Sequence, residues 1–143
     1  VKDRTDILIN QLLELWEDSV TATHTFLSPT EIKNIKPYAL KALKTVPHLI
    51  IIENVDNSPV AFMVIANNKL EMLFVKSDEL RKGYGKELLL FGVTKYNILE
   101  VVVNEQNNNA KEFYQHMGFE VYKRSEFDEQ NQHFPILYMR RNK

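Results

Sequence analysis

A switch in hydrophobic periodicity near the middle of the chain most constrains how it can fold. Residues 70–75 are an apolar run typical of a strand, residues 84–94 are predicted to be a helix, and residues 99–103 are again typical of a strand. Two strands joined by a helical crossover lie parallel when they share a sheet. The sequence therefore predicts one parallel pair within an otherwise antiparallel sheet.

Two helices are predicted ahead of the first strand. The first begins at Asp6, its predicted N-cap, and its apolar residues recur at helical spacing until residues 21–27 break the period. Ser28, Pro29 and Glu31 mark the start of the second helix, with a serine cap, a proline at the first helical position and a carboxylate three residues after the cap. The predicted buried stripe of this second helix consists of Ile32, Ile35, Ala39 and Leu43.

Turn-forming residues separate the later segments. Asn67 and Asn68 are predicted to form a tight hairpin turn because asparagine tolerates positive φ, and Gly118 is predicted to end the last helix. The predicted strands are residues 49–53, 60–66, 70–75, 99–103, 119–124 and 135–140, and the two later helices are residues 84–94 and 107–117. The predicted fold class is therefore α/β (α+β): a mixed, mostly antiparallel sheet with helices on both faces, in one domain spanning residues 1–143.

Composition narrows the functional classes. The 143 residues include no cysteine, which excludes a zinc–thiolate site and a cysteine nucleophile and leads us to expect a cytoplasmic location. No apolar run approaches the ~20 residues of a membrane span, and residues 1–6 lack the apolar region of a secretory signal. The net charge of −1 argues against nucleic-acid binding, and the histidines lack zinc-ligand spacing, so we expect neither nucleic acid nor metal.

Two of the four glycines lie in a loop between a predicted strand and a predicted helix. The loop consists of Arg81, Lys82, Gly83, Tyr84, Gly85 and Lys86. A helix N-terminus attracts phosphate through its unpaired N–H groups, and the basic side chains add countercharge. A dinucleotide fingerprint would need glycine in place of Leu88, and a P-loop would need glycine in place of Leu80. The alternative is a tight turn in which the glycines serve backbone geometry alone.

A second cluster of polar residues lies on the last predicted helix. Asn107, Ala110 and Tyr114 are spaced at i, i+3 and i+7 and therefore share one face. Phe113 and Met117 occupy the neighbouring stripe and are predicted to be core residues. A small residue between an amide and a phenol makes a shallow groove with polar ends. The alternative for Tyr114 is a half-buried aromatic ring whose hydroxyl is hydrogen-bonded.

In order and spacing these segments together resemble the GNAT superfamily of acyl-CoA-dependent N-acetyltransferases. The resemblance rests on Leu73-Phe74-Val75, the loop from Arg81 to Lys86, Val103-Asn104-Glu105-Gln106-Asn107, Ala110, Phe113-Tyr114 and Gly118-Phe119. It covers residues 48–143, and the helical residues 16–28 resemble a branch of small bacterial enzymes in that superfamily. The predicted order of strands and helices is also the order of that family.

The resemblance implies an acetyl-CoA site. The implied cofactor-binding residues are Leu73, Phe74, Val75, Arg81, Lys82, Gly83, Tyr84, Gly85, Lys86, Asn107, Ala110 and Tyr114. The strand around Leu73 would pair with the pantetheine arm, and the loop would hold the pyrophosphate. One departure from the family pattern is Leu80, which stands where the family carries glutamine or arginine.

The implied reaction is direct attack of a primary amine on the acetyl thioester within a ternary complex. Such a reaction needs a base for the ammonium proton, donors for the developing oxyanion and an acid for the leaving thiolate. By position, Glu71 is the candidate base and Tyr114 the candidate acid, and backbone N–H groups near residues 73–75 are the candidate donors. The alternatives are a solvated charge opposite a lysine for Glu71, and a hydroxyl that only orients the sulfur for Tyr114.

The acceptor is expected to be an amine of a small molecule or of a peptide. His24 and Phe26 are candidate substrate residues, since this fold builds acceptor walls from its early helices. Glu126, Asp128 and Glu129 form an acidic stretch that favours a cationic acceptor, unless the stretch is only solvated. A homodimer in which the last strand pairs across two copies is possible on this reading. The alternative function is a catalytically degenerate acyl-CoA-binding or sensor module.

Overall fold

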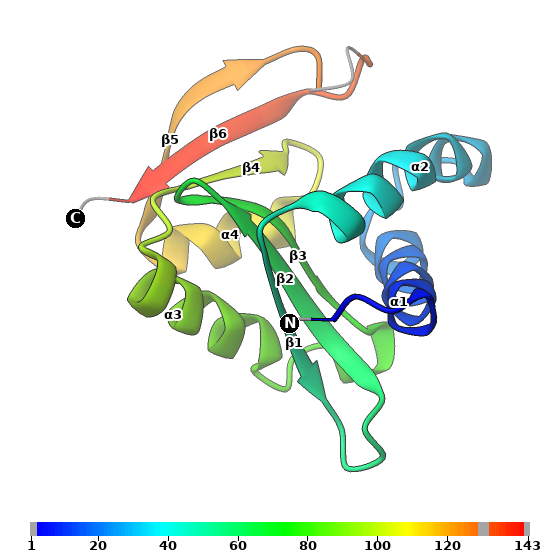
Figure 1. The fold of residues 1–143 in the computed structure, drawn as a ribbon. Coiled ribbons are helices and arrows are strands. Elements are labelled where there is room, and N and C mark those ends of the chain that lie inside the picture. The colour runs from blue at the N-terminus through cyan, green and yellow to red at the C-terminus, as the bar shows by residue number, and fades with distance from the viewer. Residues whose placement is uncertain (1–2, 129–131, 142–143) are drawn as a thin grey trace.

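The computed structural model describes residues 3–128 and 132–141. Glu129, part of the acidic stretch, lies outside the described residues. The helices are α1 (Asp6–Thr23), α2 (Pro29–Thr45), the short 3-10 helix η1 (Ser77–Glu79), α3 (Tyr84–Tyr96) and α4 (Asn108–His116). The strands are β1 (His48–Glu53), β2 (Pro59–Ala66), β3 (Lys69–Val75), β4 (Glu100–Asn104), β5 (Phe119–Ser125) and β6 (Ile136–Arg141). Every helix and strand that the sequence predicts is present, and the chain follows the predicted order (Figure 1).

The starts of the first two helices follow their capping residues. Thr5, rather than the predicted Asp6, is the N-cap of α1, because its hydroxyl accepts the N–H of Leu8 at 3.1 Å. Helix α1 also continues to Thr23, beyond the predicted break at residue 21. The predicted capping box of α2 is confirmed, since Ser28 and Glu31 each accept the backbone N–H of the other, at 3.1 and 2.8 Å.

The sheet has six strands in the order β1-β2-β3-β4-β6-β5. Its one parallel pair among the described residues joins β3 to β4, across the helical crossover that the periodicity predicts. The hairpin between β2 and β3 turns at Asn67 and Asn68, which both have positive φ, as expected. The last strand, β6, lies between β4 and β5, so it has no free edge for pairing with a second copy, and the homodimer itself stays a prediction.

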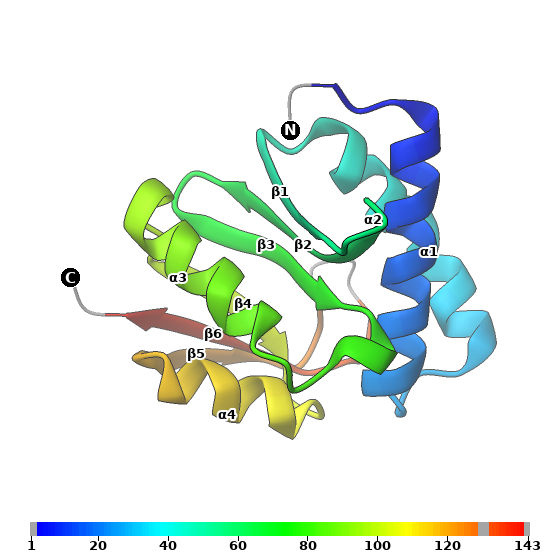
Figure 2. The same cartoon turned by 90° about the horizontal axis from the view of Figure 1, so that it is seen from below.

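Helices cover both faces of the sheet, as predicted (Figure 2). On one face α1 and α2 bury Leu12 and Leu43 against Phe62 of β2. On the other face α3 and α4 pack on a second cluster that includes Leu89 and Met63. Burying apolar side chains on two faces of one sheet supplies most of the driving force for the fold. Among the described residues no helix is both long and apolar enough to cross a bilayer.

Candidate active site

A β-bulge opens the middle of the sheet. In the β2–β3 register Val64 faces Met72 and the next residue, Ile65, faces Leu70, so Glu71 is an extra residue on β3. Bulges bend a strand and raise its twist, and they occur often beside active sites. The parallel pairing of β3 with β4 is registered only before this point, at residues 69 and 70. From Glu71 onward β3 and β4 therefore diverge and leave an opening between them.

The backbone of β3 offers hydrogen-bonding groups to this opening. The N–H of Lys76, just after the strand, donates to the carbonyl of Val60 on the β2 side at 2.8 Å. Because N–H groups alternate in direction along an antiparallel ladder, those of Val75 and Leu73 lie on the opposite edge, toward β4. The structure thus places the predicted backbone-binding segment at the opening.

The glycine loop leads from β3 into the N-terminus of α3. Arg81 and Gly83 both adopt left-handed backbone conformations, with φ of 68° and 88°. Gly83 is the N-cap of α3, and no side chain accepts the N–H groups of the first turn. Backbone geometry therefore explains the glycine at position 83, as expected if it serves a tight turn.

Gly85 has no such structural explanation. Its φ is not positive, and a Cβ placed there would lie 3.8 Å from Phe113 and 3.9 Å from Val75, which is ordinary contact. Alanine would thus be sterically acceptable in the folded protein and would favour the helix. The space that a Cβ would fill lies in the first turn of α3, where the N–H groups suit an anion. This cradle fits the pyrophosphate of the implied cofactor.

The basic side chains of the loop divide into two groups. Lys82 lies 2.8 Å from the carboxylate of Glu79, which raises the lysine pKa. Arg81 and Lys86 are exposed, and within the described residues neither forms an ion pair with a carboxylate. Arg81 and Lys86 are therefore better placed than Lys82 to neutralise a bound anion.

Helix α4 presents Asn107 and Tyr114 as its two polar candidates. The side-chain carbonyl of Asn107 caps the helix by accepting the N–H of Ala110 at 3.2 Å. Tyr114 is 7% exposed and packs edge-on against Phe113 and Phe119, with centroid distances of 5.2 and 5.9 Å. Phe113 and Met117, predicted to be core residues, are half-buried and pack against the core cluster. Burial raises the pKa of Tyr114, so its phenol stays protonated at neutral pH.

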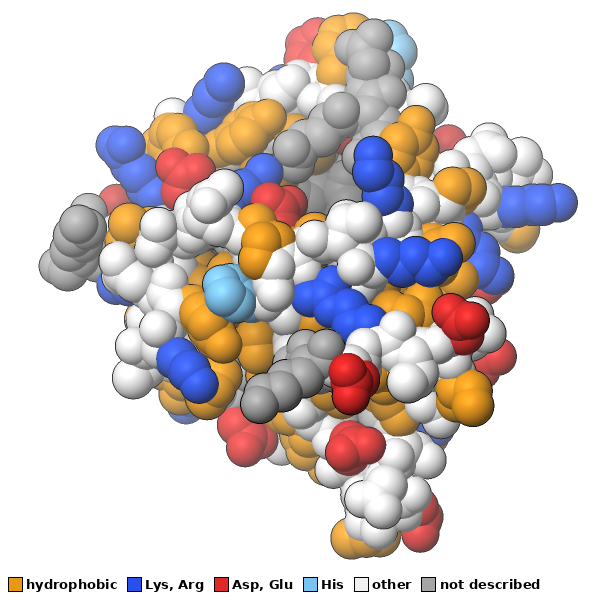
Figure 3. Space-filling view, in the orientation of Figure 1, with side chains coloured by type: hydrophobic (Ala, Val, Ile, Leu, Met, Phe, Trp, Pro, Cys, Tyr) orange, Lys and Arg blue, Asp and Glu red, His pale blue; other side chains and the backbone are white. Residues whose placement is uncertain are grey.

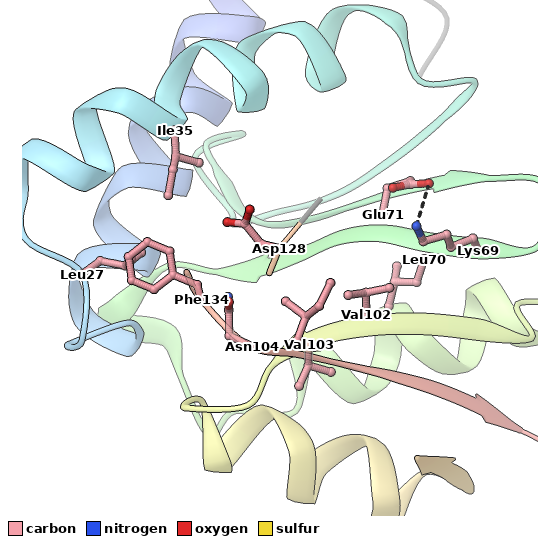
Figure 4. A pocket seen from close by; sticks show the side chains of 11 residues that line it. Leu27, Ile35, Lys69, Leu70, Glu71, Val102, Val103, Asn104, Asp128 and Phe134 are labelled. Carbon is pink, nitrogen blue, oxygen red and sulfur yellow. Dashed lines mark ion pairs between the residues drawn. The ribbon is translucent and has the colours of Figure 1, made fainter. Parts of the chain in front are cut away.

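A pocket of about 180 Å³ lies on the α2 side of the opening (Figure 4). Its polar lining includes Glu71 and Asp128. The carboxylate of Glu71 lies 4.0 Å from the ammonium of Lys69, which agrees with the alternative that Glu71 is a charge opposite a lysine. Apolar lining residues include Leu27, Ile35 and Phe134. Ile35, predicted to belong to the buried stripe of α2, is half-buried: it packs against the core cluster and also lines the pocket. Tyr114 belongs to the core cluster beneath α3 and α4, so the two candidate catalytic residues approach from opposite faces.

His24 and Phe26 form part of an aromatic row beside this pocket. The ring of His24 lies 5.4 Å from Phe26 and 6.4 Å from Phe74, and Phe26 lies 6.1 Å from the pocket residue Phe134. The hydroxyl of Thr23 donates its one proton to the carbonyl of residue 19, so it accepts from His24 Nδ1–H at 2.8 Å. The tautomer thus leaves a lone pair on Nε2. Burial lowers the pKa of His24 to about 4, so the ring is neutral at pH 7.

The lowered pKa of the half-buried His24 should make the protein sensitive to acid. Between pH 6.5 and about 4 the unfolded chain binds a proton at His24 that the folded chain does not, so stability falls as the pH falls. We expect the change H24Q to remove about 2 kcal/mol of the stability loss between pH 7 and pH 5. Urea unfolding of both proteins at the two pH values measures this difference, and equal losses would contradict the assignment.

Sequence reasoning missed several residues of the pocket. Lys69 and Phe134 line it from positions far apart in the chain, and no local pattern brings them together. The i, i+2 spacing of Lys69 and Glu71 on one strand was a usable signal for their shared face. Among the described residues no cluster of three or more histidine, aspartate or glutamate side chains could hold a metal.

Comparison with known proteins defines the family. A model of the acetyltransferase (GNAT) domain matches residues 28–141, and the chain therefore belongs to the GNAT family of acetyltransferases. It is 35% identical over 127 residues to the peptidyl-lysine N-acetyltransferase YjaB of Salmonella typhimurium, covering 89% of this chain and 87% of that protein. The protein of the same name from Escherichia coli is 33% identical, with coverage of 89% and 86%.

Solved structures agree with this assignment. The solution structure of apo-form YjaB from Escherichia coli superposes with a TM-score of 0.83 at 32% identity, covering 92% of this chain and 89% of that one. A protein from Bacillus anthracis solved in complex with acetyl coenzyme A has a TM-score of 0.56 at 20% identity and shares the fold over 66% of this chain and 61% of that one. The protein is thus an N-acetyltransferase, of a family that uses acetyl-CoA.

Proposed function

We propose that this enzyme transfers an acetyl group from acetyl-CoA to the side-chain amine of lysine in a peptide or protein. The observation that carries the proposal is the opening between β3 and β4. Anion-binding groups lie at its α3 side, and at its α2 side lies an apolar-walled pocket that two carboxylates and Lys69 also line. Two substrates could approach such an opening from opposite faces of the sheet. A cytoplasmic location is part of the proposal, because acetyl-CoA is an intracellular metabolite.

On the cofactor side, the chain's own groups would hold each part of acetyl-CoA. The first turn of α3 and the exposed Arg81 and Lys86 would bind the pyrophosphate. The edge of β3 at Leu73 and Val75 would pair with the amides of the pantetheine arm, as a neighbouring strand would. The Asn107 amide and Tyr114 on α4 would face the thioester end. Gly85 would allow the phosphate to approach the backbone closely.

On the acceptor side, the pocket suits one extended side chain. Its volume of about 180 Å³ lies below the ~300–1,000 Å³ of sites that enclose a whole drug-sized molecule. Leu27, Ile35 and Phe134 would pack on the methylene groups of a lysine, while Glu71 and Asp128 would attract its ammonium. His24 and Phe26 would support the wall through their ring contacts. The curated relatives' names include peptidyl-lysine as the acceptor, which agrees with this choice.

The chemistry assigns a role to each group around the opening. Acetyl-CoA supplies the thioester whose acetyl carbon forms a bond to the amine nitrogen as the carbon–sulfur bond breaks. Glu71 takes the proton that the ammonium must lose before attack. The N–H groups of Leu73 and Val75 are the candidate donors to the carbonyl oxygen as charge develops on it. The Tyr114 hydroxyl donates a hydrogen bond to the departing sulfur. The nitrogen loses a second proton as the amide forms, and that proton ends on the sulfur, which leaves as a thiol.

A thiol-release assay with an acceptor panel tests the proposal. The panel holds a peptide with one internal lysine, the same peptide with that lysine Nε-acetylated, a peptide whose single amine is its N-terminus, and small primary amines. We expect release only with acetyl-CoA and the free lysine peptide, with the acetylated peptide as the control. Release only with small amines or the N-terminal amine would overturn the lysine assignment. Acetyl-CoA binding without release would instead favour the binding or sensor module.

The change Gly85→Ala should separate stability from cofactor binding. Alanine fits the space at position 85 without a clash, so we expect unchanged or slightly higher thermal stability. Its methyl group would occupy the cradle, so we expect acetyl-CoA affinity to fall at least about tenfold. Titration calorimetry and thermal unfolding measure the two effects. A variant that binds acetyl-CoA as the wild type does would contradict the role given to Gly85.

A further inference from the structure

A carboxylate on α1 is bound to the segment that precedes the glycine loop. Asp18 Oδ2 accepts the backbone N–H of Ser77 at 2.7 Å, and its Oδ1 accepts the Ser77 hydroxyl at 2.9 Å. Ser77 is the first residue of η1, two residues after the end of β3. The two residues are 59 positions apart in sequence, so this pair of hydrogen bonds joins a helix on the acceptor face to the cofactor loop.

The other end of η1 is also fixed. Glu79, its last residue, lies 2.8 Å from the ammonium of Lys82. Between Glu79 and Lys82 the chain passes through Leu80 and the left-handed Arg81, and Gly83 follows directly. The short segment from Ser77 to Gly83 thus depends on side-chain contacts at both ends, because η1 buries no residue of its own.

Asp18 does little for the anchoring of its own helix. Helix α1 already buries Leu12, Leu15, Trp16 and Val20 in the core beneath α1 and α2, whereas Asp18 and Ser77 are only half-buried. Hydrogen bonds to an ionised carboxylate are stronger than neutral ones. The hydrogen bonds of Asp18 therefore order mainly the segment from Ser77 to Gly83. A loop held in its binding conformation spares the ligand the cost of ordering it.

We infer that Asp18 is a positioning residue for the cofactor site: it orders η1, and through it the turn at Gly83 that receives the pyrophosphate. This inference rests on the proposed acetyl-CoA function. Asp18 touches neither substrate in this arrangement and acts through Ser77. The predicted consequence is a loss of acetyl-CoA affinity when the carboxylate is removed, while turnover at saturating acetyl-CoA is retained.

The test compares the change D18A with E14A, a matched control. Glu14 lies one turn earlier on α1 and lines the same surface groove, whereas both of these hydrogen bonds to Ser77 involve Asp18. We expect D18A to raise the acetyl-CoA Kd and KM about tenfold, within the range of measured coupling between sites, with kcat within about twofold of wild type. E14A should match the wild type, and D18N, which keeps an acceptor oxygen, should fall between.

Hydrogen exchange of the protein without ligand supplies an independent measurement. The amides of residues 77–83 should exchange faster in D18A than in E14A, whereas amides in β2 should be unchanged. If the wild type binds no acetyl-CoA, the proposed function fails. If the wild type binds and D18A binds equally well, only the role of Asp18 is overturned. A uniform fall in stability with unchanged Kd would show that Asp18 serves the fold alone.

Discussion

Replacing Tyr114 with phenylalanine should lower kcat about 10- to 100-fold while leaving the Kd for acetyl-CoA near its wild-type value. The ring would still fill its place between Phe113 and Phe119, so the fold should persist. What is lost is one hydroxyl that burial keeps protonated by raising its pKa. Such a hydroxyl stabilises the departing sulfur more than the intact thioester, so its removal affects turnover more than binding.

Steady-state kinetics with the lysine peptide, together with titration of acetyl-CoA, measure this effect. The change Y122F is a suitable control, because the hydroxyl of Tyr122 donates to Glu100 at 3.2 Å on an exposed part of the sheet, outside the pocket lining. Y122F should retain wild-type turnover. An unchanged kcat in Y114F would remove any role of the hydroxyl in the chemical step.

Replacing Glu71 with glutamine should reduce kcat at pH 7 by about 100-fold, the scale of a lost general base. Glutamine keeps the shape of the side chain at the bulge but cannot accept the ammonium proton. The rise of kcat with pH on the acidic side should therefore flatten in the variant. Rates measured from pH 5.5 to 9.5 with saturating substrates test both effects.

Two further variants make the Glu71 result specific. Glu53→Gln changes a carboxylate at the end of β1, on a strand that does not border the opening, and should leave the profile unchanged. Asp128→Asn removes the other described carboxylate of the pocket lining. If E71Q keeps the wild-type pH profile and D128N loses it, the base is Asp128 rather than Glu71.

The order of helices and strands was predicted well from the sequence, because short sequence patterns mark where each element begins and ends. The crossover from residue 75 to residue 99 required a parallel pair, and the Ser28–Glu31 capping box fixed the start of α2 to the residue. The bulge at Glu71 could not be predicted in this way. It is defined by the register between β2 and β3, and a run of apolar residues does not reveal where one strand carries an extra residue.

The candidate site was predicted in part, and the family resemblance supplied most of it. The residues that the resemblance implies lie at defined places in the structure. Gly83 is the N-cap of α3, and Gly85 lies in its first turn with room for a Cβ. Asn107 is the N-cap of α4, and Tyr114 is a buried ring on that helix. Their roles in binding and catalysis stay predictions. The ion pair of Lys82 with Glu79 follows an i, i+3 spacing that sequence could have shown, whereas the contact of Asp18 with Ser77 depends on tertiary packing.

One face of the molecule carries both signs of charge. On the face shown in Figure 3, basic and acidic side chains are interspersed rather than gathered into a field of one sign. The chain as a whole carries eighteen basic and nineteen acidic residues. Such a surface gives little long-range steering, so selection of a lysine acceptor would depend on the short-range contacts of the pocket.

The bulge at Glu71 also means that the sheet contains an edge in its interior. An exposed strand edge elsewhere invites pairing with another chain, and proteins commonly blunt or cover it. Here the edge lies between two halves of one sheet, and helices cover both faces of that sheet. Under the proposed function the pantetheine arm pairs with this edge, and the cofactor completes the sheet as a short extra strand. The same bulge that ends the pairing of β3 with β4 would then provide the strand edge to which the cofactor binds.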